Sequence, residues 1–188
     1  MKTSATLLIL WGLLSTVAAS AQQPLASPLT RSAASLTPED LRREAALYEA
    51  LKSNDPVAVK RLLKHKIDLN PLYQPPLLDV RATAYHAAPF LYWALLFRCR
   101  NEILRALVAS GADVGFRFHE PEDVTLLMQT AFQFPAASVR FLLDHGARIN
   151  ARTLSGRTAL MFAITDDDPA LGERSGADAA GNAALLIS

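Results

Sequence analysis

The stretch VRFLLDHGARINAR, residues 139–152, contains the pattern that decides the fold. Its apolar residues Val139, Leu142 and Leu143 have the i, i+3, i+4 spacing of one helix face, and the pattern stops at Gly146. Glycine readily adopts the left-handed backbone conformation that ends many helices. The sequence therefore predicts a helix that ends at Gly146 and is followed by a polar loop.

The same unit occurs elsewhere in the chain. Two further triplets keep the apolar spacing, namely Leu104, Leu107 and Val108, and Val59, Leu62 and Leu63. Thr125 and Thr158, which each precede an apolar run, are 33 residues apart. A period of about this length, with a helix, a turn, a second helix and a polar loop in each unit, predicts an array of repeats.

The segments GRTALMFA, residues 156–163, and VRFLLDHGARINAR resemble the ankyrin repeat, whose units contain G-x-T-P-L-H-x-A and later V-x-x-L-L-x-x-G-A-x-V-N. The T-P-L-H positions fall at residues 45–48, 88–91, 125–128 and 158–161, and the G-A-x-V-N positions at residues 66–70, 111–115 and 146–150. The resemblance implies an all-α fold, an ankyrin-repeat solenoid of about four helix–turn–helix repeats with finger loops. The last repeat or repeats are expected to be incomplete.

The chain departs from the family pattern in three ways. The His of T-P-L-H is replaced by Tyr48, Met128 and Met161, so we expect apolar packing to contribute more of the stacking. Lys66 stands where Gly usually takes the left-handed conformation, at a cost of about 1 kcal/mol. Residues 178–188 resemble the start of a further repeat that stops inside its first helix, which predicts either a stunted cap or an incomplete array.

The N-terminal region is predicted to lie outside the repeat domain. Lys2, the apolar segment 7–14 and the small residues 19–21 predict a signal peptide over residues 1–21, with an uncleaved anchor as the alternative. We therefore expect a periplasmic or secreted protein. Residues 22–37 are predicted to be a flexible leader and residues 38–188 the repeat domain, with repeats at about residues 38–70, 84–115, 121–150 and 154–188.

The first helix of the repeat domain has a clear predicted start. Thr37 suits the N-cap position, Pro38 the first helical position, and Asp40 lies three residues after the cap, where a carboxylate faces the helix dipole. The helix is predicted to run to about Leu51, and Pro56 is predicted to open the second helix.

The overall charge gives little indication of a charged partner. The 188 residues contain 19 Lys and Arg against 18 Asp and Glu. A chain this close to neutral offers no electrostatic footprint for nucleic acid or an anionic membrane. We therefore predict no nucleic-acid partner and no membrane insertion after signal cleavage. Cys99 is the one cysteine, so the chain forms no internal disulfide.

The sequence contains no Gly-rich phosphate loop and no G-x-S-x-G, H-E-x-x-H or C-x-x-C motif. His65 and His145 occupy the same repeat position just before the helix end, where an imidazolium meets the helix dipole favourably. Residues 166–168 are three aspartates followed by Pro169, which favours a solvated turn over a calcium loop. Cys99 is predicted to be a small turn residue. We predict no catalytic residue, no cofactor and no metal site.

An insertion of about a dozen residues lengthens the first loop, over residues 71–87. Its candidate partner-binding residues are Tyr73, Arg81, Tyr85 and His86, because Tyr and Arg often anchor interfaces and His in a loop is available for binding. The alternative is that the loop folds back and covers residues 91–97. Both interpretations stay open at this stage.

The next finger, residues 115–124, adds two candidates. Strand alternation predicts that Phe116 and Phe118 pack inward while Arg117 and His119 point outward as partner contacts. Three large aromatic residues of the first helices are predicted to lie in the core: Tyr92, Trp93 and Phe132.

The resemblance implies that the protein recognises another protein through its finger loops and concave face, as a monomer or in a hetero-complex. An inhibitor or immunity role against a toxin, and support of a periplasmic enzyme, both remain open within this class. Two alternatives come from other classes: an enzyme or metal-binding protein on the same scaffold, and a structural fragment of a longer array.

Overall fold

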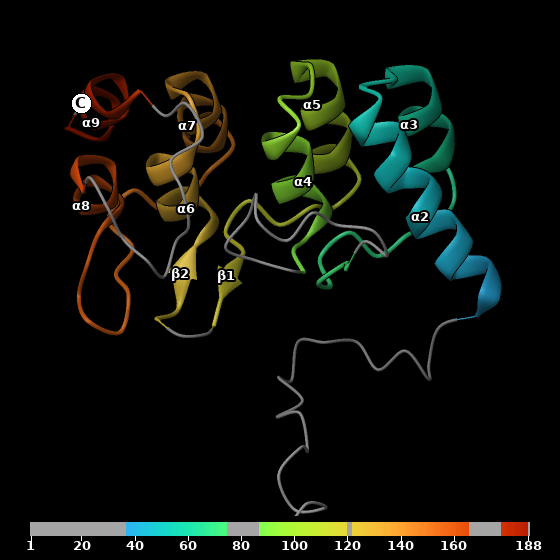
Figure 1. Ribbon diagram of the computed structural model, residues 1–188, viewed down its shortest axis with the longest axis horizontal. Helices are drawn as coiled ribbons and strands as arrows, with labels where there is room; N and C mark the ends of the chain where they lie inside the picture. Colours follow the sequence, from blue (N-terminus) through green and yellow to red (C-terminus); the bar gives the residue numbers. More distant parts are fainter. Residues whose placement is uncertain (1–36, 75–86, 120–121, 166–177, 188) are drawn as a thin grey trace, which may run out of the picture. The chain divides into compact units, whose positions relative to one another are not determined.

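The computed structural model describes residues 37–74, 87–119, 122–165 and 178–187, all within the unit Arg31–Ser188. These residues form helices α2 to α9 and one antiparallel sheet of two short strands (Figure 1). The chain is mostly helical, as the all-α prediction required. The predicted signal peptide, all of the leader except Thr37, and the acidic residues 166–168 lie outside the described residues.

The first helix pair begins as the sequence predicts. Helix α2 spans Pro38–Lys52, and Thr37 and Asp40 form a capping box in which each side chain accepts from the other's backbone N–H, at 3.2 and 3.1 Å. Helix α3 spans Pro56–Leu62, and Asp55 Oδ1 accepts from two backbone N–H groups of its first turn. These contacts satisfy donors that have no partner within the helix, and both predicted helix starts are confirmed.

The remaining helices continue the pairing. Their bounds are α4 Phe90–Leu96, α5 Asn101–Ala109, α6 Leu126–Gln133, α7 Ala136–Asp144, α8 Ala159–Ile164 and α9 Ala179–Ile187, with strands β1 Arg117–Phe118 and β2 Val124–Thr125 between α5 and α6. Each helix of a pair contacts the other, in α2–α3, α4–α5, α6–α7 and α8–α9. Contacts between pairs join first helices, as in α2–α4 and α6–α8, and second helices, as in α3–α5 and α7–α9 (Figure 1).

Glycine ends two of the second helices in the same way. Gly111 and Gly146 have φ of 97° and 92°, and the residue after each donates a backbone hydrogen bond to the carbonyl of Leu107 or Leu142 respectively. This is the pattern of a helix end closed by a left-handed residue. Lys66 does not share it, because it is absent from the described non-glycine residues with positive φ, which are Asn54, Arg98 and Asp123. The expected backbone strain at Lys66 is therefore wrong.

The core is centred on α4 and α6, the first helices of the two middle pairs. Every side chain of α6 is buried, and so is every side chain of α4 except the half-buried Leu96. Tyr92, Trp93 and Phe132 are at most 1% exposed, which confirms their predicted core positions. Tyr92 also joins the second and third pairs, because its hydroxyl lies 3.3 Å from Gln133 Oε1 and its ring packs against Phe134.

The last helix is packed against three others. Helix α9 contacts α8, α7 and α6 and forms a pair with α8. Asn182 of α9 is fully buried, and its Nδ2 donates to the carbonyl oxygens of Ala131 and Phe134, both at 2.9 Å. The segment resembles a repeat start in sequence, but its buried amide fixes it against the end of α6. No helix among the described residues is long and apolar enough to span a membrane.

Candidate functional site

The hairpin of β1 and β2 positions the outward side chains of the second finger. Its register pairs Arg117 with Thr125 and Phe118 with Val124. Phe116 and Phe118 are 8% and 4% exposed, and their rings meet edge to face at 5.2 Å. The side chains of Arg117 and His119 are more open, at 31% and 53% exposed. The predicted alternation of inward and outward residues is therefore present.

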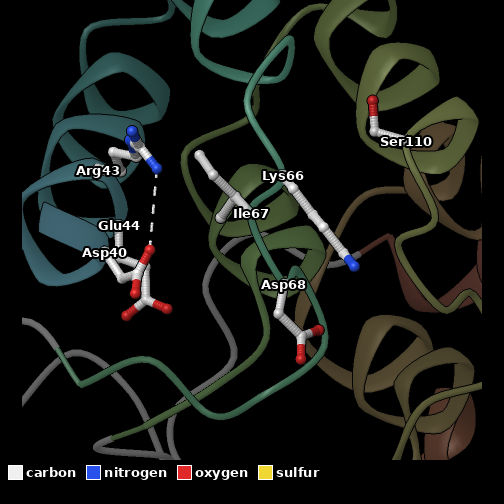
Figure 2. A pocket seen from close by; sticks show the side chains of 7 residues that line it. All are labelled: Asp40, Arg43, Glu44, Lys66, Ile67, Asp68 and Ser110. Atoms are coloured by element: carbon white, nitrogen blue, oxygen red, sulfur yellow. Dashed lines mark ion pairs between the residues drawn. The ribbon is translucent and has the colours of Figure 1, made fainter. Parts of the chain in front are cut away.

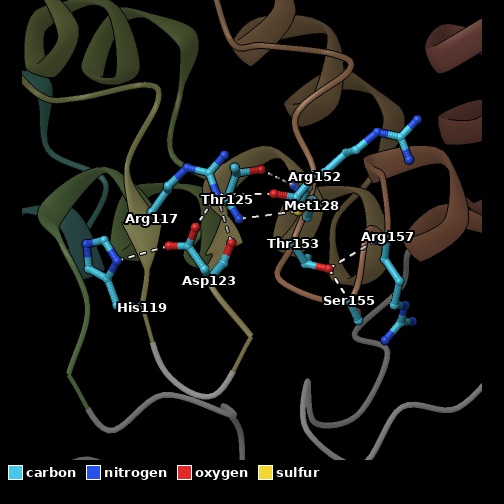
Figure 3. Close-up of polar contacts among 9 residues, drawn as sticks. All are labelled: Arg117, His119, Asp123, Thr125, Met128, Arg152, Thr153, Ser155 and Arg157. Atoms are coloured by element: carbon cyan, nitrogen blue, oxygen red, sulfur yellow. Dashed lines mark hydrogen bonds and ion pairs between the residues drawn. The ribbon is translucent and has the colours of Figure 1, made fainter.

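Arg117 is held in place by its surroundings (Figure 3). Its Nη1 donates to the carboxylate of Asp123, to the Asp123 carbonyl at 3.0 Å and to the Arg152 carbonyl at 3.3 Å. The first two contacts close the hairpin, and the third reaches the following turn. Arg117 was predicted to contact a partner, and this stays a prediction. Within the protein its bonds support the hairpin and the following turn.

Asp123 lies between the two outward residues. One carboxylate oxygen pairs with Arg117, and the other is 2.9 Å from Nδ1 of His119, whose side chain is 53% exposed (Figure 3). The backbone of Asp123 has φ of 56°, a conformation that is uncommon for residues other than glycine. Asp123 thus orients both side chains. Sequence reasoning missed it, since a single aspartate before a short strand gives no distinctive signal.

The following turn, residues 153–157, is tied to the hairpin. The backbone N–H of Leu154 donates to the carbonyl of Glu122 at 3.1 Å, and the Ser155 hydroxyl donates to the Glu122 carboxylate. Gly156, with φ of 83°, permits the tight reversal of the chain, and Arg152 Nη1 donates to its carbonyl at 3.0 Å. The hairpin and this turn therefore form one continuous surface, which we call the two-turn surface and define as residues 117–119, 122–123 and 152–156.

An apolar side chain projects from the two-turn surface. Leu154 is 77% exposed although its backbone is hydrogen-bonded to Glu122. The exposed or partly exposed polar residues around it in the surface include His119, Glu122 and Arg152. Sequence reasoning did not single out Leu154, although an isolated leucine in the polar segment RTLSGR was a signal that could have been used.

The described part of the chain has at least two hollows. One, of about 280 Å³, lies between successive loops and is lined by Arg117, Thr125 and Arg148 among others. The other, of about 500 Å³, is open and polar and is lined by residues of α2, of the loop after α3, and by Ser110 (Figure 2). Figure 2 shows carboxylates of α2 on one wall and Lys66 on the other. Charges of both signs line it, and its Asp40 is already engaged in the helix cap.

Tyr73 belongs to the packed part of the protein. It forms an isolated antiparallel bridge with Ala88, and its ring stacks on Phe90 at 5.1 Å and packs against Tyr48 at 5.5 Å. Burial, and then the charge of Glu44, raise the pKa of Tyr73. At this residue the chain packs onto the core, and whether the rest of the insertion covers residues 91–97 lies outside the described residues. Arg81, Tyr85 and His86 lie outside the described residues.

Cys99 and His145, the other residues with reactive side chains considered above, make contacts within the protein. Cys99 is buried, its Sγ lies 3.2 Å from the Leu51 carbonyl, and burial raises its pKa to about 11, so the reactive thiolate is disfavoured. His145 stacks on the Phe141 ring at 4.1 Å, and its Nδ1 is 2.7 Å from the Phe141 carbonyl. Within the described ranges no three His, Cys, Asp or Glu side chains are grouped as metal ligands.

Comparison with protein-family models and with curated proteins finds no match to this chain.

Proposed function

We propose that the chain is an exported, ankyrin-like repeat array that binds another protein through its two-turn surface. The equivalence of the units supports the fold part of this proposal. Gly111 and Gly146 end α5 and α7 with the same backbone sign and the same hydrogen bond. Thr125 and Thr158 both stand at the N-cap of a first helix.

Met128, which replaces the His of the T-P-L-H motif, takes part in the cap at the start of α6. The N–H of Met128 donates to Thr125 Oγ1 at 3.2 Å, and the N–H of Thr125 lies 3.4 Å from the sulfur of Met128. The thioether thus takes the acceptor position of a capping box, in which a side chain at N3 reaches back to the N-cap. This supports the interpretation of 125–128 as a diverged form of the family motif.

The observation that carries the binding proposal is the joining of two loops around an exposed leucine. Arg117 and Glu122 link the hairpin to the turn that holds Leu154, which is 77% exposed. Protein interfaces typically contain an apolar anchor surrounded by polar side chains, and a surface fixed before binding loses less conformational entropy. A protein partner with an apolar pocket and a polar rim fits this arrangement.

The helices contribute less to the proposed interface than the family resemblance implies. The concave face of an ankyrin array is lined by first helices, yet α6 has no exposed side chain and α4 has one that is half-buried. Contacts with a partner therefore fall on the loops. We accordingly place the interface on the two-turn surface and not on the inner helices.

The proposal is tested by affinity capture with a matched pair of variants. Leu154→Asp and Ile187→Asp each replace an exposed apolar side chain, 77% and 73% exposed, by one negative charge. The wild-type chain and Ile187→Asp should recover the same discrete protein from periplasmic extract in equal amounts, and Leu154→Asp should lose it. Purified partner and isothermal titration then give the affinities.

Equal recovery by all three chains would contradict the choice of surface. Recovery of no discrete protein by the wild-type chain would contradict the function itself. Circular dichroism spectra that agree among the three chains establish that lost binding does not reflect lost folding.

A further inference from the structure

The charges of the chain are segregated along its length. Residues 56–66 and 98–109, which contain helices α3 and α5, hold seven Lys and Arg and one acidic residue, Glu102. Of the totals of 19 and 18, the rest of the chain then holds 12 Lys and Arg against 17 Asp and Glu. The near-zero net charge therefore conceals a strongly basic region and a compensating acidic remainder.

The basic side chains of the two helices meet on one exposed face. Helices α3 and α5 contact each other, and Lys60 of α3 forms an ion pair with Glu102 of α5 across their boundary. Arg61 and Lys64 follow Lys60 by one and four residues, Arg105 follows Glu102 by three, and all three are exposed. We call this the α3–α5 face and define it by Val57, Lys60, Arg61, Lys64, Glu102 and Arg105. Its single carboxylate is already paired, so the face remains positively charged.

An apolar side chain accompanies these cations. Val57 is 76% exposed and precedes Lys60, Arg61 and Lys64 by three, four and seven residues. The separations of three and four place Lys60 and Arg61 on the same side of α3 as Val57, and Lys64 follows in the turn after the helix. Such a combination suits a lipid headgroup layer, where cations bind phosphates and a small apolar side chain enters between headgroups.

We propose that the α3–α5 face binds the surface of an anionic lipid bilayer. The chemistry it recognises is the lipid phosphodiester, through Lys60, Arg61, Lys64 and Arg105. A nucleic acid also carries phosphodiesters, but single-strand binders add aromatic stacking platforms, and the α3–α5 face has none. The two hollows described above do not include any residue of this face.

This surface is separate from the two-turn surface. In Figure 1, α3 and α5 lie on the side of the helix pairs away from strands β1 and β2. Binding to a bilayer through α3 and α5 therefore leaves the hairpin accessible. The proposal is independent of the proposed protein partner, and each can fail without the other.

The test measures sedimentation of the full chain with vesicles. One set contains equimolar phosphatidylglycerol and phosphatidylcholine, and the other contains phosphatidylcholine alone. The wild-type chain should bind the anionic vesicles in preference, and added salt should weaken this binding because it screens exposed charges. Both vesicle types offer the same hydrocarbon interior, so the apolar segment 7–14 contributes equally to each.

Two double charge reversals locate the binding face. Arg61→Glu with Lys64→Glu should reduce binding to anionic vesicles by about 10-fold or more, since each basic residue near such a surface contributes roughly a factor of five. Arg42→Glu with Arg148→Glu changes the net charge equally at exposed sites outside the face and should have a much smaller effect. Arg61→Gln with Lys64→Gln, a milder change, serves if the reversal prevents folding.

Three results would overturn the proposal. The first is equal sedimentation with the two vesicle types, which excludes recognition of the phosphodiester. The second is an equal loss in the test and control variants, which excludes this face. The third is tighter binding of the wild-type chain to a DNA duplex than to anionic vesicles, which assigns the face to nucleic acid.

Discussion

The side-chain amide of Asn182 donates a hydrogen bond of 2.9 Å to the carbonyl oxygen of Phe134. The same amide nitrogen donates to the carbonyl of Ala131 at 2.9 Å. Four residues after Ala131 stands Pro135, which has no N–H, so the Ala131 carbonyl has no donor at the usual helical position. Asn182 supplies the donor that this end of α6 lacks and thereby fixes α9.

Replacing Asn182 by Ala should lower the free energy of unfolding by about 2 kcal/mol, because two buried carbonyls lose their donor. The amide oxygen itself has no partner among the described residues, so its removal adds no cost. Urea denaturation followed by circular dichroism measures the change. Asn150→Ala, at an exposed position, is the control and should change the stability by less than about 0.5 kcal/mol. Equal effects of the two variants would refute the proposed role of Asn182.

Double-mutant cycles should give a larger coupling free energy for the Arg117–Asp123 ion pair than for an ordinary surface ion pair. The side chains of Arg117 and Asp123 are 31% and 23% exposed and are joined by a charged hydrogen bond, so we expect a coupling of about 1 kcal/mol. Lys60 and Glu102 are about half exposed, and their coupling should fall within experimental error. The same denaturation assay gives both values. A weaker coupling for the hairpin pair would argue against its structural role.

Gly146→Ala and Lys66→Gly should both fail to stabilise the protein, for different reasons. Gly146 has φ of 92°, and an alanine methyl group at this position would meet no atom within 4 Å, so alanine adds backbone strain of about 1 kcal/mol without a steric clash. Lys66 has no positive φ to relieve, so glycine there adds conformational freedom to the unfolded chain. If thermal unfolding showed that Lys66→Gly stabilises the protein, Lys66 would carry the backbone strain that the family resemblance implied.

Stability should depend on the protonation of Cys99 at alkaline pH. Burial raises its pKa from 9.0 to about 11, so between these values the folded state holds a proton that the unfolded state releases. The stabilising contribution is therefore complete below about pH 9 and is lost as the pH rises towards 11. The free energy of unfolding of the wild type relative to Cys99→Ala should therefore decrease between about pH 9 and pH 11. A constant difference would contradict burial of the thiol.

The proposed export is tested by the N-terminus of the protein recovered from its native cell. Intact-mass measurement of the periplasmic or extracellular protein should give a chain that begins at Gln22. A mass that includes residues 1–21 would support the uncleaved anchor instead.

Local patterns predicted the helix ends well. Thr37 and Pro38 predicted the start of α2, and Gly111 and Gly146 predicted two ends, because caps and left-handed residues depend on a few consecutive side chains. Lys66 was misjudged because the loop after α3 avoids the conformation that the equivalent residues Gly111 and Gly146 adopt. Aligning the similar segments shows which residues occupy equivalent positions, but it does not determine their backbone angles.

The candidate site was less predictable because it depends on contacts between distant residues. Alternation along the strand gave the outward direction of Arg117 and His119, but not the bond from Arg117 to the carbonyl of Arg152. The link from Glu122 to Ser155 likewise joins residues 33 positions apart. Net charge was similarly uninformative, since it sums over the chain, whereas a surface depends on which residues lie together.

The complete burial of α6 and the near-complete burial of α4 restrict how this protein can diversify. A substitution in these helices changes the packing of its neighbours before it changes any outside contact. Substitutions at the exposed residues of the two turns, His119, Arg152, Leu154 and Ser155, leave that packing intact. Descendants of this chain that acquire new partners should therefore differ at the turns while their inner helices stay nearly the same.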